Sequence, residues 1–157
     1  MPQLCRVTES LLLGTARAAC DEELLAREGV TFCVNVTRQQ PFPALPGIRV
    51  AVRDDPAEDL LRHLEPSAAA IERALRAGGR CLVYCKNGRS RSAAVCTAFL
   101  MRHLRLPLGD AFQVVKAARP VAEPNAGFWS QLQRYEEDLQ KRKHSAPLSK
   151  GLKNDDV

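Results

Sequence analysis

The sequence has few aromatic residues and no long apolar run. Phe, Trp and Tyr make up 5% of its 157 residues, which is too few for the base-stacking surfaces of proteins that bind single-stranded nucleic acids. Its longest apolar runs, near residues 11–13 and 93–100, are far shorter than the roughly 20 residues that a membrane-spanning helix needs. We therefore expect neither a nucleic acid nor a membrane among the partners of this protein.

Paired cysteine motifs and a secretion signal are also absent from the sequence. The six cysteines stand singly, without CxxC pairs or histidines at ligand spacing, at Cys5, Cys20, Cys33, Cys81, Cys85 and Cys96. This pattern favours neither a zinc site nor a disulfide scaffold, so we expect no metal and no other cofactor. The N-terminus has no charged stretch followed by an apolar segment, which predicts a cytoplasmic protein with access to the nucleus. We also expect a monomer.

The composition that is present fits one globular domain that favours anionic ligands. Hydrophobic residues make up 45% of the chain, and 23 Lys and Arg outnumber 18 Asp and Glu. A modest positive charge attracts anions but falls short of a nucleic-acid footprint. From Lys141 onward large apolar residues are almost absent. We therefore expect one folded domain over residues 1–140 and a basic disordered tail over residues 141–157.

The hydrophobic patterning predicts strands that alternate with helices. Short apolar runs predict strands at 4–7, 11–13, 32–36, 48–52 and 81–84. Of these, 32–36 and 48–52 read as largely buried parallel strands. Helical spacing and end signals predict helices at 21–29, 59–77, 92–103, 108–118 and 128–140. Asp21 and Asn125 are good N-caps, and Pro66 is an expected irregularity. This order predicts an α/β fold, in which a central, mostly parallel sheet of about five strands is flanked by helices.

The loop between strand 81–84 and helix 92–103 is suited to hold an anion. A short loop before a helix directs free backbone N–H groups at one point, where the helix dipole adds positive charge. Gly88 allows close approach, and Arg91 can donate two hydrogen bonds to one oxyanion. The same field stabilises a thiolate at Cys85, and Ser92 is placed to donate its hydroxyl to that sulfur.

Residues 85–92 read Cys-Lys-Asn-Gly-Arg-Ser-Arg-Ser, which resembles the cysteine, five residues, arginine signature of protein tyrosine phosphatases. Later segments, at Ala111-Phe112, Arg119-Pro120, Pro124-Asn125 and Phe128, are similar to the small, atypical dual-specificity phosphatases. The resemblance runs from about Val7 to Gln140. It implies the cysteine-dependent phosphatase fold and makes residues 1–140 a catalytic domain that acts on phosphoproteins.

The resemblance also implies roles for the loop residues. Cys85 would be the nucleophile, Arg91 would stabilise the phosphoryl oxygens, and Ser92 would assist departure of the thiolate. The residues between them, expected to bind the phosphoryl group, are Lys86, Asn87, Gly88, Arg89 and Ser90. The side chains of Lys86 and Arg89 are expected to point outward, either as ordinary solvated cations or to dock acidic phosphosubstrates.

The family needs a general acid on a separate loop, and Asp54 and Asp55 are the candidates. Asp54 lies 31 residues ahead of Cys85, which matches the usual alignment and makes it the preferred residue. The alternative interpretation is that both are ordinary acids that precede a helix near Pro56.

Tyr84 departs from the family pattern, which has histidine immediately before the catalytic cysteine. A phenol can donate one hydrogen bond but cannot become cationic, so we expect a less acidic Cys85 thiol and slow turnover. The three histidines, His63, His103 and His144, are expected to be solvated rather than catalytic.

These observations predict a dual-specificity phosphatase that hydrolyses phosphotyrosine and phosphoserine or phosphothreonine through a cysteinyl-phosphate. Two alternatives stay open: a phosphate-binding module with weak or no activity, and a rhodanese-like sulfurtransferase. The second does not require the Arg91-Ser92 ending or an acid such as Asp54. A nucleotide-binding P-loop is excluded because no Gly-Lys-Ser/Thr follows the glycine.

Overall fold

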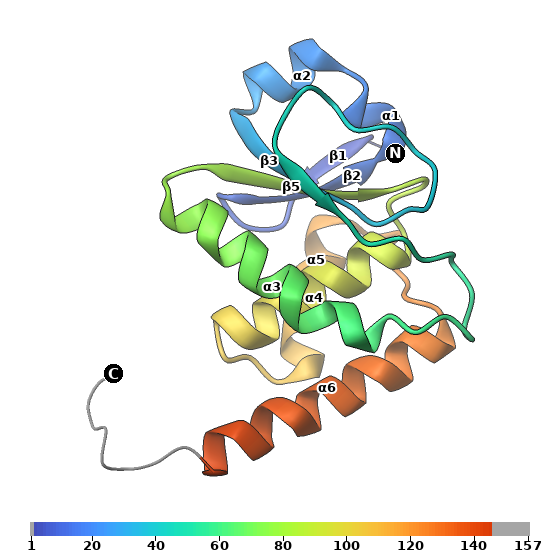
Figure 1. Cartoon of the computed structure of the whole chain (residues 1–157), viewed down its shortest axis with the longest axis vertical. Coiled ribbons are helices and arrows are strands. Elements are labelled where there is room, and N and C mark those ends of the chain that lie inside the picture. Colours follow the sequence, from blue (N-terminus) through green and yellow to red (C-terminus); the bar gives the residue numbers. More distant parts are fainter. Residues whose placement is uncertain (1, 146–157) are drawn as a thin grey trace.

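The protein is built around a five-stranded sheet with the strand order β1-β2-β5-β3-β4 (Figure 1). The structure is a computed structural model that describes residues 2–145. The strands are β1 (Leu4–Arg6), β2 (Leu11–Thr15), β3 (Val30–Asn35), β4 (Gly47–Arg49) and β5 (Arg80–Cys85). Only the β1–β2 pair is antiparallel. The expected fold, a mostly parallel sheet of about five strands flanked by helices, is confirmed.

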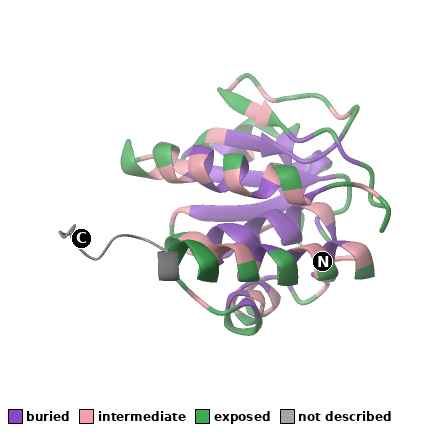
Figure 2. Ribbon diagram, turned by 60° about the horizontal axis from the view of Figure 1, so that its bottom comes forward, coloured by how far each residue is buried: buried purple, intermediate pink, exposed green. Residues whose placement is uncertain are grey.

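Helices cover both faces of this sheet. They are α1 (Ala16–Ala19), α2 (Glu22–Arg27), α3 (Leu61–Arg76), α4 (Arg91–His103), α5 (Leu108–Ala118) and α6 (Ala126–Ser145). Helices α1 and α2 lie on one face and α3 to α6 on the other, as Figure 1 shows. The larger core lies under α3 to α6, where α4 is buried at almost every position (Figure 2). A smaller core lies under α1 and α2 and contains Leu12, Leu25 and Tyr84.

Two of the expected helix signals act as predicted. The Asp21 side chain accepts a hydrogen bond from the Leu24 N–H at 3.0 Å and begins α2. Gly29 then adopts a φ of 70°, a conformation that side chains rarely tolerate, between α2 and β3. At α6, the Asn125 Oδ1 accepts from the Phe128 N–H at 2.8 Å. Both caps satisfy backbone donors that have no partner within their helix.

The structure corrects the expected strand at 48–52. Strand β4 ends at Arg49 and is the edge of the sheet, with Gly47 and Arg49 exposed, so it is not largely buried. The Val52 N–H donates to the Val50 carbonyl at 2.9 Å, and this tight turn takes the chain out of the sheet. Both valines stay buried, which is why the apolar pattern continues past the end of the strand. Pro66 lies inside α3 and does not interrupt it.

The C-terminal helix is longer than the sequence predicts. Helix α6 continues to Ser145, so the expected boundary at residue 140 is five residues too early. One contact beyond that boundary is the ion pair between Arg142 Nη1 and Glu65 Oε2, 3.1 Å apart. The rest of the expected tail, 146–157, lies outside the described residues. None of the helices within 2–145 is long and apolar enough to cross a membrane.

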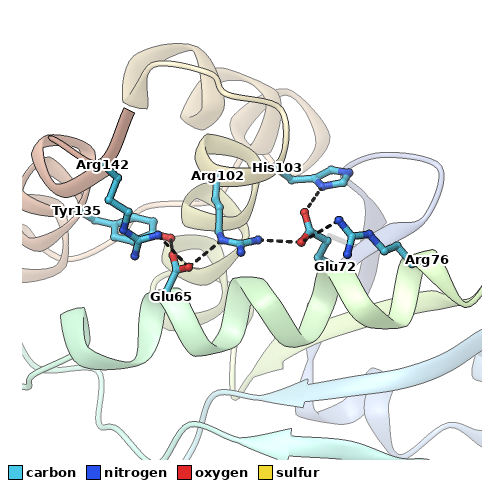
Figure 3. A network of polar contacts seen from close by, with 7 residues as sticks. All are labelled: Glu65, Glu72, Arg76, Arg102, His103, Tyr135 and Arg142. Atoms are coloured by element: carbon cyan, nitrogen blue, oxygen red, sulfur yellow. Dashed lines mark hydrogen bonds and ion pairs between the residues drawn. The ribbon is translucent and has the colours of Figure 1, made fainter. Parts of the chain in front are cut away.

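A network of charged side chains ties α3 to α4 and α6 (Figure 3). Its members are Glu65, Glu72, Arg76, Arg102, His103, Tyr135 and Arg142. The Arg102 guanidinium bridges the two acids, with Nε 2.9 Å from Glu65 and Nη1 3.0 Å from Glu72. Hydrogen bonds from His103 and Arg102 lower the pKa of the Glu72 carboxyl. This network holds together three of the helices that cover one face of the sheet.

Candidate active site

Residues 86–90 form the candidate phosphate-binding loop, which follows the carboxyl end of a central strand of the sheet. Strand β5 lies between β2 and β3 and ends at Cys85, and α4 begins at Arg91. Gly88 has a φ of 63°, and a Cβ there would lie 2.8 Å from the Gly14 carbonyl oxygen. A side chain at this position would collide with the backbone, so the loop can close this tightly only with glycine.

Cys85 lies at the bottom of this loop. Cys85 is 2% exposed, and its Sγ lies 3.0 Å from the Oγ of the fully buried Ser92. A thiolate at Cys85 would accept a hydrogen bond from that hydroxyl. The N-terminus of α4, a helix of 13 residues, adds positive potential at the same place. A phosphoryl oxyanion held above Cys85 would meet the same positive potential.

Arg91 is oriented by one contact and retains an unpartnered donor. Its Nη1 donates to the Val52 carbonyl at 3.1 Å. Its Nε is buried and has no hydrogen-bond partner within the described residues. A buried guanidinium donor without a partner costs free energy unless a ligand accepts its hydrogen bond. A tetrahedral oxyanion above Cys85 would supply that acceptor.

A pocket of about 390 Å³ brings these groups together, and we call it the catalytic pocket. It is lined by Asp54, Cys85, Asn87, Arg89, Ser90, Arg91, Glu123, Pro124, Asn125 and Ala126. The loop after β4, the loop after β5 and the start of α6 therefore meet here, although they are far apart in the sequence.

The two candidate acids have different surroundings. Asp54 lines the catalytic pocket and accepts a hydrogen bond from Asn125 Nδ2 at 2.9 Å. Asp55 instead accepts from the Ala57 N–H at 2.8 Å within its own turn. Asn125 also uses its backbone N–H to contact Ser90 Oγ at 2.9 Å. The preferred acid therefore lies across from the phosphate loop, held by a residue that contacts that loop.

Arg119 is a site residue that the sequence reasoning missed. It is 2% exposed, and its Nε donates to the Gly88 carbonyl at 2.6 Å. Its Nη2 donates to the Asn87 carbonyl at 3.2 Å, and its Nη1 to the Pro2 carbonyl at 2.7 Å. Because a trans peptide directs its C=O and N–H to opposite sides, these contacts turn loop N–H groups away from Arg119. The one available signal, an arginine before Pro120, does not reveal burial.

Tyr84 points away from Cys85. Neighbouring residues of a strand face opposite sides of the sheet, and Tyr84 packs in the core under α1 and α2, whereas Cys85 belongs to the other core. The Tyr84 hydroxyl donates to the Pro41 carbonyl at 2.8 Å. Burial raises the pKa of this phenol, so it stays neutral at physiological pH.

The remaining predicted residues lie at the rim or elsewhere. Lys86 and Arg89 are both exposed, and Arg89 Nη2 lies 3.8 Å from Glu123 Oε1. His63 and His103 lie on α3 and α4 outside the pocket, and the side chain of His144 lies outside the described part of the chain. Among the described residues, no group of three His, Cys, Asp or Glu is placed to hold a metal ion.

A cysteine at the end of a central parallel strand, a phosphate-type loop and an arginine that begins the next helix define the architecture of a cysteine-dependent phosphatase. The chain belongs to the dual specificity phosphatase family, because residues 11–138 match the family model described as Dual specificity phosphatase, catalytic domain. It is thus a protein phosphatase of this family.

Individual relatives agree with this assignment. Human dual specificity phosphatase 28 is 72% identical over 142 residues, which cover 88% of this chain and 81% of that protein. The crystal structure of human DUSP28 superposes with a TM-score of 0.87 at 70% identity, and covers 89% of this chain and 97% of that one. A mouse putative dual specificity phosphatase, solved in complex with zinc tungstate, gives a TM-score of 0.88 at 63% identity, covering 91% and 92% of the two chains.

Proposed function

We propose that this phosphatase hydrolyses phosphotyrosine and phosphoserine or phosphothreonine through a cysteinyl-phosphate formed on Cys85. The observation that carries the proposal is the pairing of a nucleophile with a free oxyanion donor in one pocket. Cys85 Sγ lies 3.0 Å from Ser92 Oγ, and the buried Nε of Arg91 has no partner among the described residues. This arrangement suits a thiolate that attacks phosphorus while the guanidinium binds the equatorial oxygens.

The first half of the reaction transfers the phosphoryl group to sulfur. The Cys85 thiolate forms the S–P bond as the P–O bond to the substrate breaks. Arg91 and the N–H groups of residues 86–90 stabilise the charge on the three non-bridging oxygens. Asp54, in its protonated form, gives its proton to the departing oxygen.

The second half of the reaction releases inorganic phosphate. The Asp54 carboxylate removes a proton from a water molecule as that water attacks phosphorus. The S–P bond then breaks, and the Ser92 hydroxyl donates a hydrogen bond to the departing thiolate. Asp54 regains the proton that it needs for the next cycle, so the step leaves the enzyme unchanged.

We also propose that Tyr84 keeps turnover low. Its phenol is buried and neutral, lies in the core on the other side of the sheet from Cys85, and bonds to the Pro41 carbonyl, so it supplies no positive charge to the phosphate loop. A Tyr84→His variant should speed alkylation of the Cys85 thiol near neutral pH and raise activity there. The matched control is Tyr84→Phe, which loses the Pro41 contact but stays neutral. An unchanged alkylation rate in folded Tyr84→His protein would show that Tyr84 does not limit the reactivity of Cys85.

The experiment that tests the reaction compares two cysteine variants on phosphotyrosine and phosphoserine peptides. Cys85→Ser should abolish phosphate release, whereas Cys20→Ser, which alters an exposed free cysteine outside the pocket, should leave it intact. Phosphate release that survives in pure Cys85→Ser protein would remove the mechanism.

The second candidate is a phosphate-binding module with weak or no activity, and Tyr84 is the observation that favours it. In this case wild-type protein would bind inorganic phosphate in a calorimeter through Arg91, yet would release none from an aryl phosphate. Catalytic phosphate release that depends on Cys85 would exclude an inactive module.

A further inference from the structure

A second pocket of about 390 Å³ adjoins the catalytic pocket, and we call it the side pocket. It is lined by Thr37, Arg38, Gln39, Gln40, Arg53, Asp54, Lys86 and Arg91. Two of these, Asp54 and Arg91, line both pockets, so the two share a wall. Four cationic side chains and one carboxylate line the side pocket, and this excess of positive charge favours an anion.

Three of these cations have no partner within the fold. The side chains of Arg38, Arg53 and Lys86 are exposed and form no ion pair or hydrogen bond with another residue of the described chain. Neighbouring Arg49, by contrast, donates to the carbonyls of Thr37 and Gln40. Exposed cations that have no partner among the described residues and line a pocket beside the candidate active site are available to a ligand.

The wall of the side pocket is held in place before any ligand arrives. Asn35 Nδ2 donates to the Gln40 carbonyl at 2.9 Å, and Thr37 Oγ1 donates to Asn35 Oδ1 at 2.7 Å. The Gln40 N–H donates to Thr37 Oγ1 at 3.0 Å. Arg49 adds its two bonds, at 3.1 and 3.0 Å, from the edge strand β4. A rigid wall lowers the entropy cost of binding.

We propose that the side pocket binds an acidic side chain that neighbours the phosphorylated residue of a peptide substrate. This inference rests on the proposed function, since it places the phosphoryl group in the catalytic pocket. A peptide is favoured over a lipid because large apolar side chains are scarce on the surface. Within residues 2–143 only Phe42 and Leu104 are both large, apolar and exposed, and the Arg49 guanidinium lies 5.0 Å from the Phe42 ring centre.

The test measures kcat/KM for two phosphotyrosine peptides that differ only in charge. One carries glutamates on both sides of the phosphotyrosine, and the other carries glutamines. Wild-type enzyme should prefer the glutamate peptide. Arg38→Gln and Arg53→Gln should each reduce that preference about three- to tenfold, while kcat/KM for a simple aryl phosphate changes less than about twofold.

Arg27→Gln is the control for general electrostatic attraction. Arg27 is exposed at the end of α2, next to the amino end of β3 and so at the opposite end of the sheet from both pockets. The Arg27→Gln substitution removes the same charge as the two pocket variants and should leave the preference for the glutamate peptide unchanged. An equal loss in Arg27→Gln would show that net charge, not the side pocket, causes the preference.

The remaining outcomes are separable. If wild-type enzyme hydrolyses both peptides equally, the side pocket does not bind acidic side chains of the substrate, although the proposed function stands. If a short-chain phosphoinositide is preferred to the glutamate peptide, the peptide assignment is wrong. If hydrolysis persists in Cys85→Ser protein, the proposed function itself fails, whatever the peptide preference.

Discussion

Removing the Arg119 guanidinium should loosen the phosphate loop, because Arg119 donates hydrogen bonds to two of the loop's carbonyl groups. In Arg119→Met, three carbonyl oxygens lose their donor, those of Gly88, Asn87 and Pro2, at 2.6, 3.2 and 2.7 Å. A contact of Nη1 with Cys5 Sγ, at 3.3 Å, is lost as well. The methionine keeps much of the side-chain volume but offers these acceptors nothing.

The size of the effect follows from these contacts. A hydrogen bond from a charged group is worth about 1.5–3 kcal/mol, and breaking a buried charged contact on one side costs about 3–5 kcal/mol. Removing the buried charge also removes its desolvation cost, so we expect the free energy of unfolding to fall by about 3 kcal/mol. That corresponds to a fall in Tm of about 10 °C. Because the loop amides lose their fixed direction, kcat/KM should fall about 10- to 100-fold.

The assay combines urea unfolding with kcat/KM for an aryl phosphate, measured well below the Tm of the variant. Arg134→Met is the control, because Arg134 forms an exposed pair with Asp138 on α6 at 3.3 Å. That change should cost less than about 0.5 kcal/mol and leave kcat/KM unaltered. If Arg119→Met matches wild type in both measurements, the carbonyl contacts do not hold the loop and our reasoning is wrong.

Three further predictions concern the acid, the loop and the charged network. Asp54→Ala should lower kcat about 100-fold for a poor leaving group and far less for one that leaves unprotonated, whereas Asp55→Ala should show no such selectivity; steady-state kinetics decides. Gly88→Ala should abolish activity and lower Tm, as calorimetry can show, because its Cβ would lie 2.8 Å from the Gly14 carbonyl. The pKa of Glu72 is lowered from 4.5 in the folded protein, so the stability that its carboxylate contributes is full above pH 4.5 and is lost as the pH falls through the folded pKa. The free energy of unfolding, measured in urea between about pH 5 and 3, should therefore fall less steeply with decreasing pH in Glu72→Gln than in wild type.

The loop after β5 could be predicted from the sequence because its geometry is local. Cys85, Gly88, Arg91 and Ser92 occupy one strand-loop-helix segment, and the spacing alone places them around one point. The helix caps at Asp21 and Asn125 are local in the same sense. In each case the residues that interact lie within a few positions of one another.

The supports of the loop could not be predicted because they depend on tertiary contacts. Arg119 reaches carbonyls 31 and 117 residues away in the sequence, and no periodic pattern reports such a contact. The predicted end of β4 at residue 52 was wrong for a related reason, since tertiary contacts bury Val50 and Val52 although the strand ends at Arg49. The direction of Tyr84 follows from strand alternation, but its contact with Pro41 depends on how the proline-rich loop returns.

The most direct test of the central claim is a chemical trap of the phosphoenzyme. An Asp54→Asn variant, in which hydrolysis of the intermediate is slowed, would be mixed with a radiolabelled aryl phosphate whose leaving group needs no proton, then quenched and digested. We predict that the label is found on the peptide that contains Cys85 and is absent from the same digest of an Asp54→Asn, Cys85→Ser protein. Label on any other residue, or turnover without labelled protein, would contradict a cysteinyl-phosphate at Cys85.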